Sequence, residues 1–169
     1  MATKRLHKEK VSLQNTDDVI LSLIDEDDLY QWKAWIRGPA DTPYENTYFQ
    51  LKLEVPTAYP LKPPKVVFLT KIFHPNVLFR SGDICLDLLK GQWSAVYTLQ
   101  SVCLAIISLL AHPEPESPLN CDCGNLLRSG DTRGYNSMAR MYCALYGYEQ
   151  PLHETDDMST SSSDYSDSM

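Results

Sequence analysis

The strictest constraint on the fold is the stretch 47–55, in which apolar and polar side chains alternate. Successive side chains of a β-strand point to opposite faces, so this period of two predicts a strand with one buried face. The apolar set is Phe49, Leu51, Leu53 and Val55. A sheet with a single apolar face needs a cover, and a stretch with helical spacing follows downstream. The sequence therefore predicts an α+β fold.

Three further strands are predicted around this one, at Val19–Ile24, Leu29–Arg37 and Lys65–Leu69. The charged turn Asp25–Asp28 ends the first strand, and Gly38-Pro39 and Pro43 break the chain between the second and third. The four strands are predicted to form an antiparallel meander. Trp35 falls on the polar face of its strand. It is either half-covered by neighbouring side chains or part of a partner surface.

The helical cover comes from several segments. Residues 2–15 are predicted to form an amphipathic helix with Leu6, Val11 and Leu13 inward and basic residues outward. Thr98 is predicted to cap a buried helix that runs to Ala111. Within that helix, Cys103 is expected to be a core thiol.

Two short helices are predicted near the C-terminus, at Asn125–Arg128 and Asn136–Tyr146, punctuated by Gly130 and Gly134. Beyond them the chain changes character. Residues 149–169 contain six acidic side chains, no Lys or Arg, and a run rich in Ser. We expect a folded domain over 1–148 and a disordered acidic tail over 149–169.

Charge and cysteine usage exclude several classes of protein. The net charge of −7 comes mostly from the tail, and the few basic residues near the N-terminus are too small a patch for nucleic acid. Five cysteines without a disulfide pattern and without a signal peptide indicate a reducing, intracellular compartment. The longest apolar run, 102–111, is too short to span a bilayer. Cys121 and Cys123 fall short of a zinc set, so no metal or other cofactor is expected.

The chemistry is concentrated in residues 74–98, HPNVLFRSGDICLDLLKGQWSAVYT. Cys85 supplies a nucleophile, and the amide N–H of Asn76 suits a developing oxyanion. Asp87, two residues after the thiol, can steer an incoming acceptor. A thiol, a neutral donor and a carboxylate at this spacing are suited to acyl transfer.

At fixed spacing, the HPN triplet, the ICLDLL segment and the following Trp resemble the core of ubiquitin-conjugating enzymes (E2), and the resemblance covers about residues 3–147. It implies the ubiquitin-conjugating (UBC) fold and a thioester of ubiquitin on Cys85, received from the activating enzyme (E1). Asn76 would be an oxyanion donor or a loop staple. Ser117, in a Pro-rich loop beside the cysteine, would help to admit the acceptor, with Asp87 the nearer candidate for acid–base assistance.

The resemblance also implies a surface for RING-type ligases. In the family, the first helix contacts both the activating enzyme and these ligases, although a merely solvated helix face would look the same in sequence. A residue in the YPxxPP run and the loop after the Trp complete the surface. The matching residues here are Lys4, Arg5, Lys8, Leu61, Ser94 and Ala95. Ala95 stands where the family commonly has Pro, and the Asn76–Cys85 spacing is one residue longer than in common members.

Two stretches, GPADTPYEN at 38–46 and GNLLRSGDTRGYN at 124–136, are similar to the peroxisomal branch of the family in fungi. This implies a peripheral protein on the cytosolic face of the peroxisomal membrane, held by a membrane-anchored peroxin and not inserted itself. It would act with RING peroxins on cargo-import receptors. We expect the anchor to bind residues 122–147, which hold Tyr135, Met138, Met141, Tyr142 and Tyr146.

Three alternatives stand beside this interpretation. The chain could be a general cytosolic or nuclear conjugating enzyme. A cysteine hydrolase would use His74 as its base. A non-catalytic, ubiquitin-binding variant of the fold would lack the cysteine, and the intact context of Cys85 argues against that option.

Overall fold

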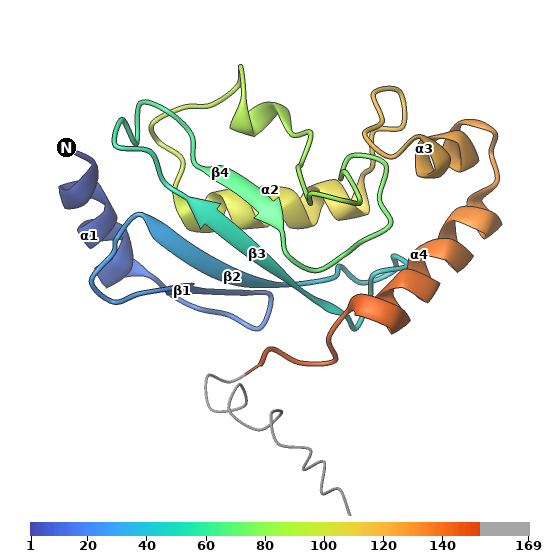
Figure 1. Cartoon of the computed structure of the whole chain (residues 1–169), viewed down its shortest axis with the longest axis horizontal. Helices are drawn as coiled ribbons and strands as arrows, with labels where there is room; N and C mark the ends of the chain where they lie inside the picture. The colour runs from blue at the N-terminus through green and yellow to red at the C-terminus, as the bar shows by residue number, and fades with distance from the viewer. Residues whose placement is uncertain (153–169) are drawn as a thin grey trace, which may run out of the picture.

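An antiparallel sheet of four strands in the order β1-β2-β3-β4 lies at the centre of the protein (Figure 1). The computed structural model describes residues 1–152. One row of buried side chains, Leu21, Ala34, Leu51 and Phe68, crosses all four strands in register. This row confirms the predicted alternation and meander. The strands span Val19–Leu23, Gln31–Arg37, Tyr48–Glu54 and Lys65–Phe68.

One helix packs on the sheet, and the other α-helices lie at the two ends of the molecule. The buried helix α2 (Leu99–Ala111) packs on β1 and β2, while α1 (Ala2–Ser12) lies at one end of the molecule (Figure 1). Helices α3 (Cys121–Arg128) and α4 (Thr132–Tyr146) lie at the opposite end. Thr98 caps α2 as predicted, since its hydroxyl accepts from the Ser101 N–H in a reciprocal capping box.

The N-terminal helix is shorter than predicted, and one of its residues was assigned to the wrong face. Leu6 is fully buried, whereas the side chain of Val11 is 86 % exposed. Five residues along an α-helix turn the side chain to another face, so the two cannot share a core-facing stripe. Leu13 packs against the core from extended backbone just after the helix ends.

The two C-terminal helices begin earlier than predicted, and Gly134 does not interrupt the second. Asn120 and Asp131 act as N-caps: their side chains accept hydrogen bonds from the N–H groups of Cys123 and Gly134. Gly134 lies in the first turn of α4, where a Cβ would collide with the Asp131 carboxylate. Gly134 therefore leaves room for the capping side chain of Asp131 and does not break the helix.

Trp35 is covered by the chain itself. Only 5 % of its surface is exposed, because the ring of Tyr148 meets it edge-on at a centroid distance of 4.9 Å. Tyr148 is held there by two backbone hydrogen bonds to Tyr48, of 2.7 and 3.2 Å. The partner-surface interpretation of Trp35 is therefore wrong. The folded body includes Tyr148, and residues 153–169 of the predicted tail lie outside the described residues.

Candidate functional site

A tight turn presents Cys85. Val77 and Ile84 pair across an antiparallel bridge, and the Gly82 N–H closes the turn by donating to the Leu78 carbonyl at 2.8 Å. Gly82 has φ +77°, and a Cβ there would collide with the Phe68 carbonyl of β4, so this position needs glycine.

The extra residue expected between Asn76 and Cys85 is accommodated in this turn. The Cys85 N–H still donates to the Asn76 carbonyl at 2.8 Å, so the thiol and the asparagine remain on adjacent backbone. The Cys85 side chain is partly exposed. An incoming carbonyl can therefore reach the sulfur.

The side chain of Asn76 is a brace between two loops. Its Nδ2 donates to the Glu114 carbonyl and its Oδ1 accepts from the Glu114 N–H, both at 2.8 Å. Asn76 is 1 % exposed. This two-way pairing with a backbone peptide unit agrees with the staple role and fixes the loop 112–120 beside Cys85.

His74 is a structural residue. It is completely buried, its Nδ1 accepts from the Asn76 N–H, and its Nε2–H donates to the Leu109 carbonyl at 3.0 Å. Burial lowers the pKa of His74 to about 4, against a smaller opposing effect of the Leu109 carbonyl. With both ring nitrogens engaged, His74 has no free nitrogen with which to deprotonate Cys85, which argues against the hydrolase alternative.

The two predicted acceptor-guiding residues, Ser117 and Asp87, are both on the surface. Ser117 is exposed in the loop 112–120, which is fixed a second time by N–H groups of Leu119 and Asn120 that donate to the Pro75 carbonyl. Asp87 opens the short 3-10 helix η1 (Asp87–Leu89) and is also exposed. Both side chains have the solvent access that contact with an acceptor requires.

Lys90 is a residue that the sequence did not single out. Its Nζ lies 3.8 Å from the Sγ of Cys85, because η1 folds the chain back after the cysteine. An ammonium group at this distance attracts negative charge on the sulfur when a thioester bond breaks. The only hint in the sequence is a cation five positions after the thiol.

Burial separates Cys85 from most of the other cysteines. Cys103 and Cys123 are fully buried, and burial raises the pKa of each to about 12. Burial also raises the pKa of Cys143. Cys121, at the start of α3, is exposed, so burial does not distinguish it from Cys85. What distinguishes Cys85 is the hydrogen bond from its N–H to the Asn76 carbonyl, which places it beside Asn76. The structure confirms Cys103 as a core thiol.

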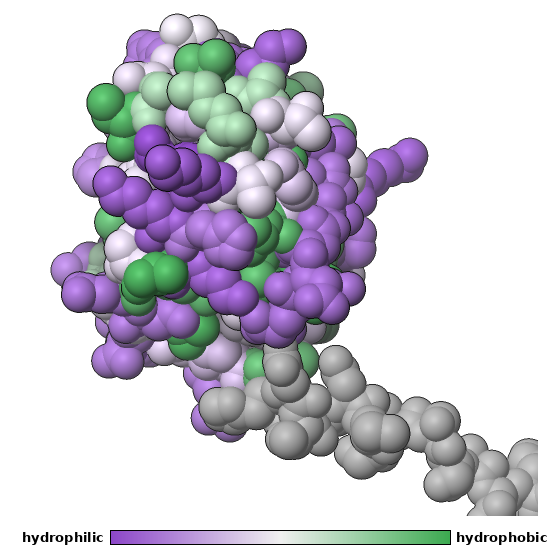
Figure 2. All heavy atoms as spheres, turned by 90° about the vertical axis from the view of Figure 1, so that its left-hand side faces the viewer, coloured by the Kyte–Doolittle hydropathy of each residue, from purple (hydrophilic) through white to green (hydrophobic). Residues whose placement is uncertain are grey.

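Most of the predicted ligase-binding residues are on the surface. Lys4, Lys8 and Ser94 are exposed, and Leu61 is 69 % exposed. Figure 2 looks onto the side that carries α1, where hydrophobic side chains gather in the upper part of the view above a mostly hydrophilic surface. Val96, next to the predicted pair Ser94 and Ala95, is 77 % exposed and adds apolar area.

Arg5 differs from this surface set. Its guanidinium donates to the carbonyls of Ala95 and Tyr97 at 2.9 and 2.8 Å. Arg5 and the backbone of Ala95 thus hold each other, and the arginine is largely committed to its own chain.

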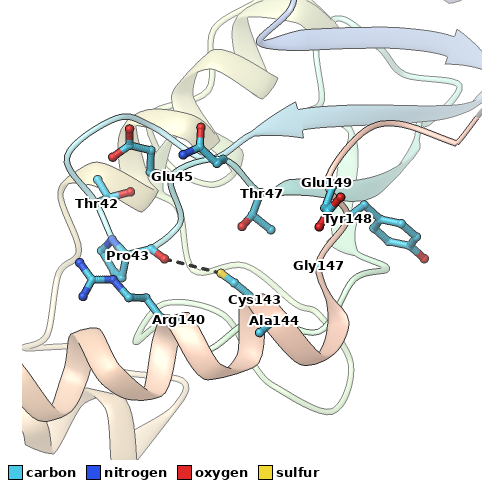
Figure 3. Close-up of a pocket in the computed structure, with 11 residues that line it drawn as sticks. Thr42, Pro43, Glu45, Thr47, Arg140, Cys143, Ala144, Gly147, Tyr148 and Glu149 are labelled. Atoms are coloured by element: carbon cyan, nitrogen blue, oxygen red, sulfur yellow. Dashed lines mark hydrogen bonds between the residues drawn. The ribbon is translucent and has the colours of Figure 1, made fainter.

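A cavity of about 630 Å³ lies elsewhere, between residues 42–47 and the end of α4 (Figure 3). The thiol of Cys143 faces it and donates to the Pro43 carbonyl at 3.7 Å. None of the predicted site residues lines this cavity. Cys85 is partly exposed and Asp87 and Lys90 are exposed, and such access at the surface suits a protein substrate.

Comparisons with known proteins agree with this geometry. The family model for ubiquitin-conjugating enzymes matches residues 5–143. The ubiquitin-conjugating enzyme E2 pex4 of Dictyostelium discoideum is 61 % identical over 145 residues, covering 85 % of this chain and 97 % of its own. Protein PEROXIN-4 of Arabidopsis thaliana is 60 % identical over 142 residues, covering 84 % and 88 %.

Among solved structures, the ubiquitin-conjugating enzyme Pex4p of H. polymorpha, crystallised in complex with the soluble domain of Pex22p, superimposes with a TM-score of 0.81. It shares 38 % of residues, and the alignment covers 86 % of this chain and 98 % of that one. The likeness to a solved conjugating enzyme confirms the predicted α+β UBC fold.

Proposed function

Since the chain belongs to the ubiquitin-conjugating enzyme family, we propose that Cys85 accepts ubiquitin as a thioester and passes it to protein acceptors. The observation that carries this proposal is the setting of Cys85. Its thiol is partly exposed, lies beside the Asn76 brace, and has the Lys90 ammonium 3.8 Å away.

Two acyl transfers make up the reaction. In the first, the Cys85 sulfur attacks the carbonyl of ubiquitin carried as a thioester by the activating enzyme; a new C–S bond forms and the old one breaks. In the second, an acceptor amine or thiol attacks the thioester carbon, and negative charge builds on the carbonyl oxygen. The bond from carbon to the acceptor forms, the C–S bond to Cys85 breaks, and the proton lost by the acceptor restores the Cys85 thiol. Asn76 contributes by holding the loop 112–120, with Ser117, beside the thioester, while Asp87 offers a carboxylate to the arriving acceptor.

The peroxisomal setting is the second part of the proposal. Relatives about 60 % identical carry the names pex4 and PEROXIN-4, which favours this branch over a general-purpose enzyme. We propose that the protein acts on the cytosolic face of the peroxisomal membrane, with RING peroxins as ligases and cargo-import receptors as acceptors. Within residues 1–152, no helix is long and apolar enough to cross a bilayer.

A membrane-anchored adaptor is proposed to bind the exposed side of α4. Met141 and Leu145, four positions apart on the same side of the helix, are 45 and 64 % exposed and form what we call the α4 apolar face. Tyr146, five positions after Met141, points to another side of the helix and stacks on Tyr142. Tyr135, included in the sequence prediction, is buried, and its hydroxyl meets that of Tyr44. Tyr142 is stacked between Phe73 and Tyr146. The complex of H. polymorpha Pex4p with Pex22p supports a protein partner of this kind.

The charging reaction tests the first part of the proposal. Incubation with activating enzyme, ATP and ubiquitin is expected to yield an adduct heavier by one ubiquitin and cleaved by thiol reagents. A chain that binds ubiquitin without forming such an adduct would be the non-catalytic variant instead, and the proposal would fail.

A further inference from the structure

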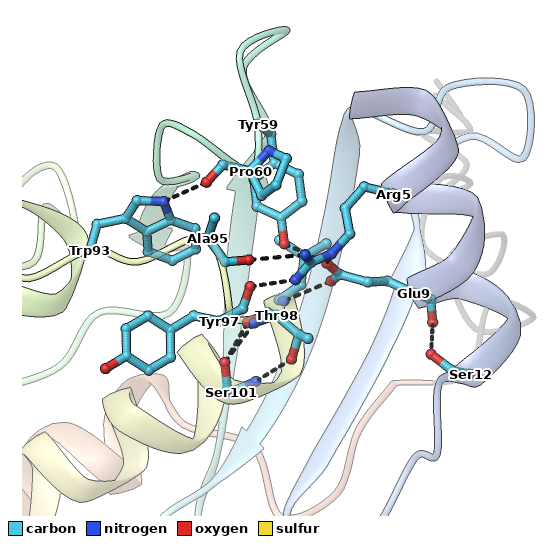
Figure 4. A network of polar contacts seen from close by, with 11 residues as sticks. Arg5, Glu9, Ser12, Tyr59, Pro60, Trp93, Ala95, Tyr97, Thr98 and Ser101 are labelled. Atoms are coloured by element: carbon cyan, nitrogen blue, oxygen red, sulfur yellow. Dashed lines mark hydrogen bonds and ion pairs between the residues drawn. The ribbon is translucent and has the colours of Figure 1, made fainter. Parts of the chain in front are cut away.

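The carboxylate of Glu9 joins three separate segments of the chain next to the predicted ligase-binding residues (Figure 4). Oε1 of Glu9, on α1, accepts from Arg5 Nε and from the Tyr59 hydroxyl, both at 2.6 Å. Its Oε2 accepts from the backbone N–H of Leu99, the first residue of α2, at 2.9 Å. Glu9 thus ties α1 to the turn 56–62 and to the start of α2.

Arg5 extends the same network to the loop 93–97. Its two terminal nitrogens hold the carbonyls of Ala95 and Tyr97, and its guanidinium lies 5.8 Å from the centre of the Tyr59 ring. The indole N–H of Trp93 closes the circuit by donating to the Pro60 carbonyl at 2.8 Å. The turn 56–62 and the loop 93–97 carry the predicted ligase-binding residues Leu61, Ser94 and Ala95. Both are therefore hydrogen-bonded to α1 and to each other.

Hydrogen-bond donors enclose the Glu9 carboxylate. The side chain is only 10 % exposed, and a buried carboxylate is stable only when donors surround it. Three donors do so here, and the N-terminus of α2 adds a favourable dipole. The pKa of Tyr59 is raised, first by burial and then by its hydrogen bond to Glu9, so the phenol stays a donor.

We infer that Glu9 is a positioning residue for ligase binding. It sets the distance between the exposed lysines of α1 and the exposed side chains of Leu61 and Val96, without itself touching the ligase. This inference rests on the proposed function, because it assumes that a RING-type ligase docks on this face. Charging is expected to use the exposed side of α1 and Cys85 but not the loop 93–97, so it should not depend on Glu9 in the same way.

The test compares Glu9→Ala and Glu9→Gln with two matched controls. Glu26→Gln removes the same charge from a carboxylate that pairs with Lys10 of α1. Glu26 itself does not belong to α1 and takes no part in the Glu9 network. Ile106→Val trims a fully buried side chain of α2 and reports general destabilisation. For each variant, three rates are measured: charging at saturating activating enzyme, discharge to free lysine, and discharge stimulated by a RING domain that is active with the wild type.

We expect Glu9→Ala to lower the RING-stimulated rate at least tenfold, since one lost hydrogen bond to a charged group is worth about a factor of ten and Glu9 accepts three. The other two rates should be unchanged. The RING-stimulated rate of Glu9→Gln should lie between those of the wild type and Glu9→Ala, since the amide keeps an acceptor oxygen. Hydrogen exchange of the 93–97 amides should accelerate in Glu9→Ala and not in Glu26→Gln.

Two results would overturn the inference: normal RING stimulation in Glu9→Ala, or an equal loss in all three rates like that of Ile106→Val. Failure of the wild-type chain to charge at all would instead overturn the proposed function, and with it the premise of a ligase-binding role.

Discussion

At the scale of single residues, Asn76 connects structure to chemistry. Asn76→Ala is expected to leave charging of Cys85 nearly intact and to slow discharge about 30-fold, the equivalent of roughly 2 kcal/mol for two lost hydrogen bonds. The physical reason is the Glu114 backbone, which loses both hydrogen bonds and releases the loop 112–120. Single-turnover charging and discharge assays measure the two steps separately.

Asn76→Asp is the matched variant, because its carboxylate still accepts from the Glu114 N–H but has no N–H for the Glu114 carbonyl. It should slow discharge at least as much as Asn76→Ala, because its second carboxylate oxygen faces the Glu114 carbonyl in a buried site. Equal losses in charging and discharge, together with a lowered Tm, would show that Asn76 acts on folding alone.

At the scale of elements, the α4 apolar face is predicted to recruit the chain to its membrane adaptor. Leu145→Asp or Met141→Asp should abolish recruitment to peroxisomal membranes and spare charging of Cys85, because the substitutions place a charge in an apolar interface. Ile24→Asp is the control, since Ile24 is 48 % exposed, close to the 45 % of Met141, and follows β1. Flotation with peroxisomal membranes measures recruitment.

Deleting 149–169 completes that comparison. The deletion spares the Tyr148–Tyr48 backbone pair, so we expect charging, Tm and recruitment to remain as in the full chain. Recruitment lost with the tail but retained in Leu145→Asp would contradict the assignment of α4.

The strands and α2 were predictable because their signals are local. Periods of two and of about 3.6 residues follow directly from which side chains face the core, as the row from Leu21 to Phe68 shows. Gly134 was misjudged because a glycine within a helix resembles a break until the Asp131 cap is seen. Helix ends depend on such caps, which sequence patterns specify poorly.

At the scale of the whole molecule, buried His74 should make stability depend on pH. Its pKa is about 4 in the folded chain and about 6.5 when unfolded, so the unfolded state binds the proton first as pH falls. Stability is therefore full above pH 6.5 and declines as pH drops toward 4. Between pH 7.5 and 5, we expect the free energy of unfolding to fall by about 2 kcal/mol from this group.

Denaturant unfolding across this pH range measures the decline, and proton NMR of the imidazoles identifies its source. A His74 signal that titrates near the ordinary pKa of about 6.5 would contradict the buried, neutral histidine.

The site was predictable to the extent that it lies within one motif. Cys85 and Asn76 stand in the motif itself, and the backbone between them brings them together. The commitment of Arg5 to carbonyls some 90 positions away depends on the tertiary fold and leaves no local signal. The same holds for the Glu114 partner of Asn76, which turns a candidate donor into a brace.

The most direct test of the central claim is the linkage formed by Cys85→Ser in the charging reaction. We predict an adduct of one ubiquitin that resists reducing agents and is cleaved by hydroxide, because an oxyester replaces the thioester. Cys85→Ala should form no adduct, and Cys121→Ser, which changes the exposed cysteine of α3, should charge as the wild type does. A Cys85→Ala chain that still gains a thiol-labile ubiquitin would contradict the assignment of Cys85.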